Sequence, residues 1–341
     1  MNREILRQVK NQFESGRNLP QGEAAPFFDA LLAETDEALL AGILTAWENK
    51  GVVENELFEI ASIMRSRCTQ IKSRHEVFVD TVGTGGSRAK TFNVSTAAAF
   101  VIAGAGIPVA KHGNRAATSK SGSADVLAEL GVNPVVDAAL AERCLDEIGI
   151  CFLFAPNFHR LSASLASARR SLGFPTIFNN LGPLCNPAKA PHQVIGVWNK
   201  NLLTRSANVL ARLGTRKSWI VHGSDGLDEI TLNGITFAAE INNGKVTEFE
   251  VAPADFGIAD SDIASLRTSS PEESAAVIDA ILNNREKNTA AENLVLINAA
   301  AAIYVGGKAE NLKSAMKLAR ESLYSGAALR KLKLLADAAK L

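Results

Sequence analysis

The sequence predicts an α/β fold in which a mainly parallel central sheet follows a small helical domain. Residues 1–72 carry apolar side chains at helical spacing and show no strand pattern. After residue 73, short apolar strands alternate with helical segments, and polar loops follow several of these strands. Parallel strands need long crossover connections, which are usually helices, so this alternation favours a parallel sheet.

The helical domain is predicted from two amphipathic segments separated by Gly51, a residue typical of helix ends. A segment near residues 160–190 also has helical potential, broken at Gly173 and Pro175, and we expect it to return to this domain. The predicted domains are therefore residues 1–72 with the returning segment, and residues 73–159 together with 191–341. The apolar positions that define the two amphipathic segments are Leu39, Leu40, Ile43, Leu44 and Trp47, then Leu57, Ile60, Ala61 and Met64.

The large domain contains four apolar segments that read as buried strands, and the chain ends in helical stretches near residues 290–305 and 309–325. Asn233-Gly234 and Asn243-Gly244 predict turns between antiparallel strands after the last of the four segments. The four segments are EVFVD (76–80), IPVAKHG (107–113), GICFLFAP (149–156) and SWIVHG (218–223).

Composition excludes several classes of protein. The chain has 341 residues, with 36 Lys and Arg against 36 Asp and Glu, so no overall field favours nucleic acid or an anionic membrane. Its four cysteines form no CxxC pair and, like the five histidines, lack the spacing of zinc ligands. The N-terminal segment has no apolar signal core, and the longest apolar stretch is interrupted by polar residues, Gly and Pro. We expect a cytoplasmic protein with reduced thiols.

The loop GTGGS (83–87) lies between a predicted strand and a helix that begins near Asn93–Ser95. Glycines let successive backbone amides point one way and hold an anion, and a helix N-terminus adds partial positive charge. A phosphate group would fit there, although a tight turn without a ligand is the alternative. The spacing matches neither a Walker loop nor a dinucleotide-binding fingerprint, because Arg88 occupies the third glycine position of the latter.

A second polar loop, KHGNRAATSKSGSAD (111–125), follows the next predicted strand. Loops at the ends of two strands in an open α/β sheet share one crevice, and Lys111 and backbone amides there would suit a highly anionic ligand such as a diphosphate. For His112 the alternative to a role in the site is a structural one, because a single histidine is more often structural than catalytic.

Acidic residues follow the last of the four predicted strands, in HGSDGLDEI (222–230). Adjacent carboxylates repel each other unless a cation neutralises them, and oxygen ligands beside a phosphate site favour Mg²⁺. A solvated acidic turn is the alternative, which the two candidate phosphate loops make less favourable. Arg169, in the returning segment, could bind a carboxylate through two hydrogen bonds, although Arg169 and Arg170 could equally be a surface pair.

Together these motifs resemble the anthranilate phosphoribosyltransferase family over nearly the whole chain. The resemblance implies a nucleoside-phosphorylase-type α/β domain, a homodimer formed through the helical domain, and transfer of phosphoribosyl from phosphoribosyl diphosphate to anthranilate with Mg²⁺, in tryptophan synthesis. The matching stretches are DTVGTGG, TFNVSTAAAFV, VAKHGNRAATSKSGSADVLAELGV, GICFLFAP, TIFNNLGPLCNPA, VHGSDGLDEI and NAAAAIYVGGKAENL.

The resemblance also assigns roles to individual residues. It implies that Ser95, Asp228 and Glu229 hold Mg²⁺. It places anthranilate at Gly83, His112, Asn114 and Arg169. It implies that phosphoribosyl diphosphate is bound by Gly83, Thr84, Gly85, Gly86, Ser87, Thr91, Asn93, Ser95, Thr96, Lys111, Thr118, Ser119 and Ser123.

The chain departs from the family pattern in two places. Ser87 stands where the family usually has Asp, and His159-Arg160-Leu161-Ser162 stands where it usually has His-Pro-Ala-Met. The second departure leaves open a phosphoribosyltransferase that uses another aromatic amine. A pyrimidine nucleoside phosphorylase shares the fold but works without magnesium, so the acidic motif argues against it. A nucleic-acid-binding paralogue without enzymatic activity would need clustered basic residues, which the chain lacks apart from RKLKLL (330–335).

Overall fold

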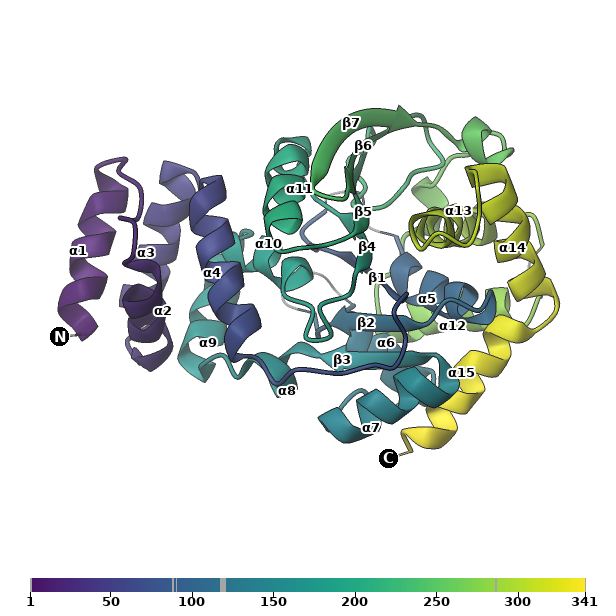
Figure 1. The fold of residues 1–341 in the computed structure, drawn as a ribbon, viewed down its shortest axis with the longest axis horizontal. Helices are drawn as coiled ribbons and strands as arrows, with labels where there is room; N and C mark the ends of the chain where they lie inside the picture. Colours follow the sequence, from purple (N-terminus) through teal and green to yellow (C-terminus); the bar gives the residue numbers. More distant parts are fainter. Residues whose placement is uncertain (1, 88, 90, 117–120, 286, 341) are drawn as a thin grey trace.

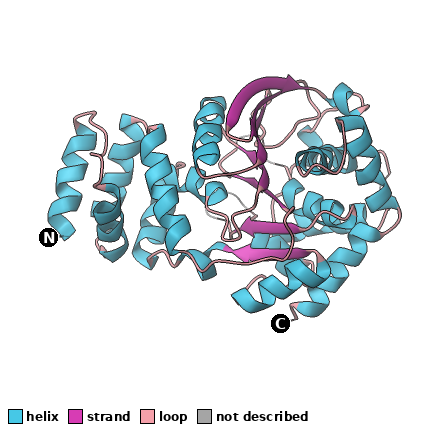
Figure 2. Ribbon diagram, viewed as in Figure 1, coloured by secondary structure: helices cyan, strands magenta, loops and turns pink. Residues whose placement is uncertain are grey.

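The computed structural model describes residues 2–87, 89, 91–116, 121–285 and 287–340. Helices at the N-terminal end form one part of the molecule, and a seven-stranded sheet covered by further helices forms the other (Figures 1 and 2). The predicted fold class, α/β with a helical domain and a mainly parallel sheet, is confirmed. Among the described helices, none is both long and apolar enough to cross a membrane.

Four helices precede the sheet: α1 (Asn2–Glu14), α2 (Ala24–Ala33), α3 (Glu37–Lys50) and α4 (Glu54–Arg67). Gly51 ends α3 with a φ of 87°, as its place between the two apolar sets predicts. Trp47 stacks on Phe13 at a centroid distance of 5.1 Å, and its indole donates to the buried Glu56 carboxylate. Burial of these side chains holds the helices together.

The sheet has the strand order β3-β2-β1-β4-β5-β6-β7, in which the first five strands are parallel and the last two antiparallel. The chain leaves β1 toward β2 and later returns to β4 on the other side of β1, so the direction of winding reverses there. Ligands of open α/β sheets bind beyond the carboxyl ends of the strands at such a point. The strands are β1 (Val79–Gly83), β2 (Val109–Gly113), β3 (Ile150–Phe154), β4 (His192–Gly196), β5 (Lys217–Gly223), β6 (Thr236–Asn242) and β7 (Lys245–Val251).

Helices cover both faces of the sheet (Figure 1). Alternate residues of β4 and β5 point to opposite faces: Val194 and Trp219 join one hydrophobic cluster, whereas Ile195 and Ile220 join the other. The first cluster contains α5 (Val94–Gly104), α6 (Ser123–Glu129), α12 (Pro271–Leu282), α13 (Ala290–Val305), α14 (Leu312–Tyr324) and α15 (Ala327–Ala338). The second contains α11 (Leu203–Arg212).

Three helices connect β3 to β4: α8 (Ala155–His159), α9 (Ala163–Leu172) and α10 (Ile177–Leu184). Leu165 of α9 and Leu181 of α10 belong to the same hydrophobic cluster as the four N-terminal helices. This segment therefore lies between the helical part and the sheet (Figure 1). The remaining short elements are α7 (Ala138–Arg143), a π-helix at Cys144–Ile148, and 3₁₀ helices at Lys200–Leu202, Pro253–Phe256 and Ala264–Leu266.

Two sequence predictions differ from the structure in detail. The first strand is β1 at Val79–Gly83 rather than residues 76–80, and Val77 is exposed, so the strand runs further into the Gly-rich motif. Asn243-Gly244 does join β6 directly to β7, but Asn233-Gly234 lies within the longer connection from β5 to β6. That connection also carries the acidic motif.

Candidate active site

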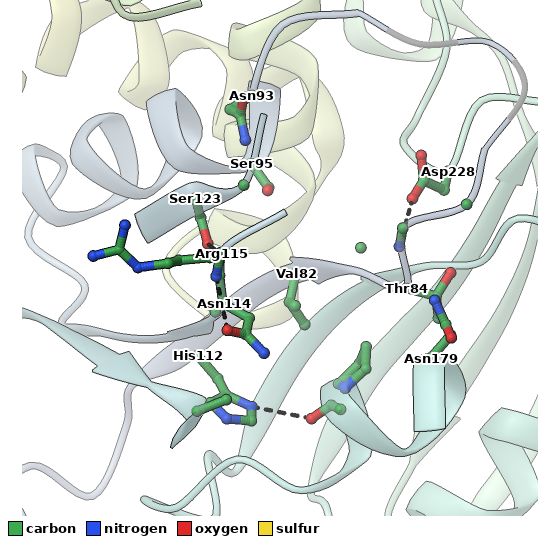
Figure 3. Close-up of a pocket in the computed structure, with 18 of the residues that line it drawn as sticks. Val82, Thr84, Asn93, Ser95, His112, Asn114, Arg115, Ser123, Asn179 and Asp228 are labelled. Atoms are coloured by element: carbon green, nitrogen blue, oxygen red, sulfur yellow. Dashed lines mark hydrogen bonds between the residues drawn. The ribbon is translucent and has the colours of Figure 1, made fainter. Parts of the chain in front are cut away.

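A crevice of about 480 Å³ lies at the carboxyl ends of β1, β2 and β5. Its walls come from the Gly-rich loop, the N-terminus of α5, the loop after β2, the connections around α8 to α10, and the turn after β5. Figure 3 shows residues of these segments around the crevice, among them Thr84, Ser95, His112, Asn179 and Asp228. The strand order therefore brings the predicted motifs to one place.

The Gly-rich loop is tied to the acidic turn. Gly85 and Gly86 adopt φ values of 66° and 81°, which residues with a Cβ rarely adopt. The Gly85 amide donates to the Asp228 carboxylate at 3.2 Å, and the Ser87 hydroxyl donates to the Gly226 carbonyl at 2.7 Å. Ser87 thus holds the acidic turn in position.

The acidic turn places two carboxylates, those of Asp228 and Glu229, in the crevice. Burial raises the pKa of Asp228, and burial together with the Asp228 charge raises the pKa of Glu229. Asp225 does not line the crevice, because its carboxylate accepts from the Leu227 amide and the Thr231 hydroxyl. Two of the three acidic side chains of the motif are therefore available to a ligand.

Lys111 supplies positive charge beside these carboxylates. Its buried ammonium donates to the Thr81 carbonyl at 2.6 Å and to the Ser95 hydroxyl at 3.2 Å. Burial lowers the pKa of Lys111, and the charges of Asp80 and Glu229 oppose that effect. The acidic motif HGSDGLDEI contains no lysine or arginine. The basic neighbour of the motif, Lys111, comes from β2.

The N-terminus of α5 presents polar groups to the crevice. Asn93 is its N-terminal flanking residue, and the Asn93 carboxamide oxygen accepts from the hydroxyls of Ser121 and Ser274. The Val94 and Thr96 amides donate to the Phe92 and Asn93 carbonyls, which leaves the Ser95 amide of the first turn for an anion, and the helix dipole favours negative charge there. This side of the crevice therefore suits a phosphate group.

The other side of the crevice carries a half-buried cation, Arg169, over an aromatic ring. The Arg169 guanidinium, in the last turn of α9, lies 5.1 Å from the centre of the Phe178 ring. Burial lowers the pKa of Arg169 to about 10, and its Nε has no hydrogen-bond partner among the described residues. Arg170 is exposed and does not line the crevice. The paired N–H donors of the Arg169 guanidinium suit a carboxylate, which can accept two parallel hydrogen bonds.

His112 is a neutral imidazole in this part of the crevice. Burial and the nearby His159 ring, whose centre is 5.1 Å away, lower the pKa of His112 well below its usual value. Since a carbonyl can only accept, Nδ1 of His112 donates to the Gly182 carbonyl at 3.0 Å (Figure 3). Its Nε2 is left as an acceptor without a partner among the described residues.

The departure from the family pattern lies on the wall of the crevice. His159, Leu161 and Ser162 line it, whereas Arg160 is exposed and adopts a φ of 49° between α8 and α9. Burial lowers the pKa of His159 to about 4, so this ring is also neutral near pH 7. Proline, which the family usually has at this place, could not adopt the backbone of Arg160.

Most of the residues singled out in the sequence come together here. Thr96 does not line the crevice, and its buried hydroxyl has no hydrogen-bond partner among the described residues. Thr118 and Ser119 lie outside the described residues. The predicted residues that line the crevice are Gly83, Thr84, Gly85, Gly86, Ser87, Thr91, Asn93, Ser95, Lys111, His112, Asn114, Ser123, Arg169, Asp228 and Glu229.

The sequence analysis did not single out several lining residues of α4 and α10 and of the loop before α12. Met64 was assigned to the core of the helical domain, and Thr268 lies in a loop with no motif. Phe178, Asn179, Gly182 and Pro183 belong to the stretch FNNLGPLCNPA, whose content of Gly, Pro and Asn was the available signal.

The donor atoms fit Mg²⁺. Two carboxylates and the Ser95 hydroxyl are hard oxygen ligands, and because burial raises the pKa of Asp228 and of Glu229, a bound cation would favour their charged forms. No group of three or more His, Cys, Asp or Glu side chains in the described part of the chain could hold a metal ion. Any ion bound here would complete its shell with ligand oxygens or water, as Mg²⁺ commonly does.

Residues 75–329 match the model of the glycosyl transferase family α/β domain. The chain is 44% identical to the anthranilate phosphoribosyltransferase of Pelotomaculum thermopropionicum over 333 residues, which are 96% of each protein, and 44% identical to that of Moorella thermoacetica over 329 residues. The chain belongs to the anthranilate phosphoribosyltransferase family.

Solved structures of the family have the same fold. That of Thermus thermophilus superposes with a TM-score of 0.87 at 36% identity, covering 97% of this chain and 98% of the other. The enzyme of Saccharomyces cerevisiae, solved in complex with PRPP and Mg, superposes with a TM-score of 0.88 at 27% identity, covering 98% of each chain. Family membership identifies the chain as a pentosyltransferase.

Proposed function

We propose that the crevice transfers the phosphoribosyl group from phosphoribosyl diphosphate to the amine of anthranilate, giving N-(5-phosphoribosyl)anthranilate and diphosphate for tryptophan synthesis. One observation carries this proposal: a single crevice has an anion-binding half, with Lys111 and two carboxylates, and a second half with Arg169 and neutral imidazoles. The first half suits a diphosphate with its counter-ion. The second suits a flat aromatic acid.

On the donor side, the phosphoribosyl diphosphate would lie between the Gly-rich loop and the N-terminus of α5. The Thr84 and Gly85 amides already donate to the Gly196 carbonyl and the Asp228 carboxylate, so the Gly86 and Ser87 amides, the N-terminus of α5 and Lys111 would hold its phosphates. Thr91, Asn93 and Ser123 supply further polar groups at this end. The roles that the resemblance implies for Thr96, Thr118 and Ser119 remain predictions.

Mg²⁺ would be held by Asp228, Glu229 and the Ser95 hydroxyl, together with diphosphate oxygens. When bound, it neutralises charge that develops on the departing diphosphate. The Gly86 and Ser87 amides and the Lys111 ammonium would stabilise the same charge, and the hydrogen bonds of Gly85 to Asp228 and of Lys111 to Thr81 already hold the loop and the ammonium in position. Loss of diphosphate leaves an oxocarbenium-like centre at C1 of the ribose.

On the acceptor side, Arg169 would bind the anthranilate carboxylate and so place the amine below C1, with Asn114 and His112 beside it. Holding two reactants in line converts the transfer into an effectively unimolecular step, with inversion at C1. As the N–C1 bond forms and the C1–O bond to diphosphate breaks, the nitrogen releases one proton to the diphosphate or to water. An aromatic amine is unprotonated near pH 7, so its lone pair attacks C1 without a strong general base. This explains why positioning residues rather than an acid–base pair line this half of the crevice.

The expected assembly and location belong to the proposal as well. We infer a cytoplasmic homodimer formed through the helical domain of residues 1–72, joined by the segment near 160–190, with residues 73–159 and 191–341 forming the domain that binds phosphoribosyl diphosphate. In a mass measurement by light scattering, twice the mass of the chain supports the dimer and the single mass contradicts it.

The direct test is the loss of anthranilate fluorescence in the presence of phosphoribosyl diphosphate and Mg²⁺. We expect consumption of anthranilate that stops when a chelator is added. Absence of consumption together with retained binding of phosphoribosyl diphosphate, measured by calorimetry, would favour another aromatic amine as acceptor, since Leu161 and Ser162 alter the wall on that side. Absence of both would contradict the proposed function.

A further inference from the structure

A buried polar cluster lies behind the acceptor half of the crevice and is not part of its wall. It consists of Asp80 on β1, Asn186 after α10 and Gln193 on β4, each of which is fully buried. None of the three lines the crevice. Buried polar side chains are costly unless their hydrogen bonds are satisfied, so a cluster of three points to a specific role.

Asp80 is the centre of this cluster. One of its carboxylate oxygens accepts from the His112 backbone amide at 3.1 Å. The other accepts from the Asn186 carboxamide at 2.8 Å and from the Gln193 carboxamide at 3.5 Å. Asp80 therefore connects β1 with β2, with β4 and with the segment that follows α10.

The hydrogen-bond partners of Asp80 also hold the last turn of α10 in place. Gln193 donates to the Pro183 carbonyl at 3.1 Å, and the His112 ring donates to the Gly182 carbonyl at 3.0 Å. Asn186 donates to the Ala110 carbonyl of β2 as well, at 2.8 Å. The Gly182 carbonyl also accepts from the Cys185 amide at the end of α10, and both α10 carbonyls are held by side chains of the sheet.

The turn that is held in this way forms part of the acceptor wall. Gly182 and Pro183 line the crevice, as do Phe178 and Asn179 one turn earlier. The Arg169 guanidinium lies over the Phe178 ring. A small shift of α10 would consequently move both the ring and the cation that face the acceptor.

We propose that Asp80 is a positioning residue that fixes the last turn of α10 and, with it, the acceptor half of the crevice. It acts through its hydrogen-bond partners and touches neither substrate. The inference rests on the proposed function, because it concerns the site at which anthranilate would bind.

The first test uses Gln193→Met, which removes the hydrogen bonds to Pro183 and Asp80, keeps the volume of the side chain and leaves the charges of Asp80 and Lys111 in place. We expect the KM for anthranilate to rise about tenfold, because two buried acceptors lose a donor and the wall loosens. The KM for phosphoribosyl diphosphate should change less than about twofold. A purely structural role would lower the folded fraction and kcat without separating the two KM values.

The second test is a double-mutant cycle between Asp80→Ala and Asn186→Ala, measured as kcat/KM for anthranilate. Asp80→Ala removes the acceptor and Asn186→Ala removes the donor, so each single change breaks the same hydrogen bond. The double variant should therefore be at least about threefold more active than the product of the single effects predicts. Additive effects would overturn the connection between the two residues.

Ser322→Ala is the matched control, since it removes a buried hydrogen bond of 2.7 Å to the Val101 carbonyl from a residue that does not line the crevice. It should lower the thermal midpoint and leave both KM values unchanged. If the wild type is active and Gln193→Met leaves the KM for anthranilate unchanged, the present inference is wrong and the proposed function stands. A wild-type protein that neither consumes anthranilate nor binds it in calorimetry overturns the proposed function and this inference together.

Discussion

Arg169 is the residue on which recognition of the acceptor depends in this account. A guanidinium binds a carboxylate through two parallel hydrogen bonds, whereas an ammonium binds it as a point charge. Arg169→Lys should therefore keep the positive charge but raise the KM for anthranilate about tenfold or more, and leave the KM for phosphoribosyl diphosphate nearly unchanged. Steady-state fluorescence assays measure both values.

The neighbouring arginine provides the control for this change. Arg170 is exposed and does not line the crevice, so Arg170→Lys should leave both KM values unchanged. If the two substitutions changed the KM for anthranilate equally, Arg169 would contribute only to the general charge of α9.

Gly196, at the end of β4, allows the acidic turn to approach the sheet. A Cβ at this position would lie 1.6 Å from the Asp228 carbonyl oxygen, so backbone would have to move. Gly196→Ala should displace Asp228 and Glu229, cost about 1–3 kcal/mol of unfolding free energy and weaken binding of phosphoribosyl diphosphate. Urea unfolding and calorimetric titration test the two effects.

Gly42 is a suitable comparison, because the nearest atoms to an added Cβ belong to the flexible end of the Lys10 side chain. Gly42→Ala in α3 should leave binding unchanged and have little effect on stability, or increase it slightly. If Gly196→Ala bound phosphoribosyl diphosphate as tightly as Gly42→Ala, close packing at Gly196 would have no functional importance.

At the scale of elements, α3 and α10 meet at a buried carboxyl group, that of Glu48. Burial raises the pKa of Glu48 to about 7, and a hydrogen bond from the backbone of Ile177, at the start of α10, opposes this effect in part. Because the folded-state pKa is above the unfolded-state value of about 4.5, folding favours the protonated form. Glu48 therefore lowers stability as pH rises from about 4.5 to 7.

Glu48→Gln should remove this contribution. The unfolding free energy of the variant, compared with that of the wild type, should increase between pH 5 and pH 8 by at most about 3 kcal/mol. Urea unfolding at the two pH values measures the difference, and the exposed Glu129→Gln provides the control. A difference that does not change with pH would contradict the raised pKa.

Elements with a clear local pattern could be predicted from the sequence. The α3 helix ends at Gly51 and Asn243-Gly244 joins two antiparallel strands, because helix-ending and turn residues act locally. The α5 helix begins after Asn93, as predicted, although the Asn93 side chain makes no capping bond to it. The strand β4 and the helix α12 were not predicted. In β4, His192 and Gln193 are buried through hydrogen bonds to other strands, which local sequence does not show.

At the scale of the whole molecule, the strand order decides which motifs meet. The sequence shows a Gly-rich loop and an acidic turn that are 143 positions apart, and only their strands' places in the sheet bring Gly85 within 3.2 Å of Asp228. Residue types in the motifs could therefore be assigned to phosphate or metal binding. The contacts of Lys111 with Ser95, and the contribution of α10 to the wall, depend on tertiary structure.

The central claim is that Asp228 and Glu229 bind phosphoribosyl diphosphate through Mg²⁺, and a calorimetric titration tests it most directly. Wild-type protein should bind phosphoribosyl diphosphate with Mg²⁺ and at least about tenfold more weakly with a chelator, and Asp228→Asn with Glu229→Gln should lose the difference. The exposed pair Asp260→Asn with Glu272→Gln, which changes the net charge equally, should behave as the wild type. Equal binding by all three proteins, with and without Mg²⁺, would contradict the account.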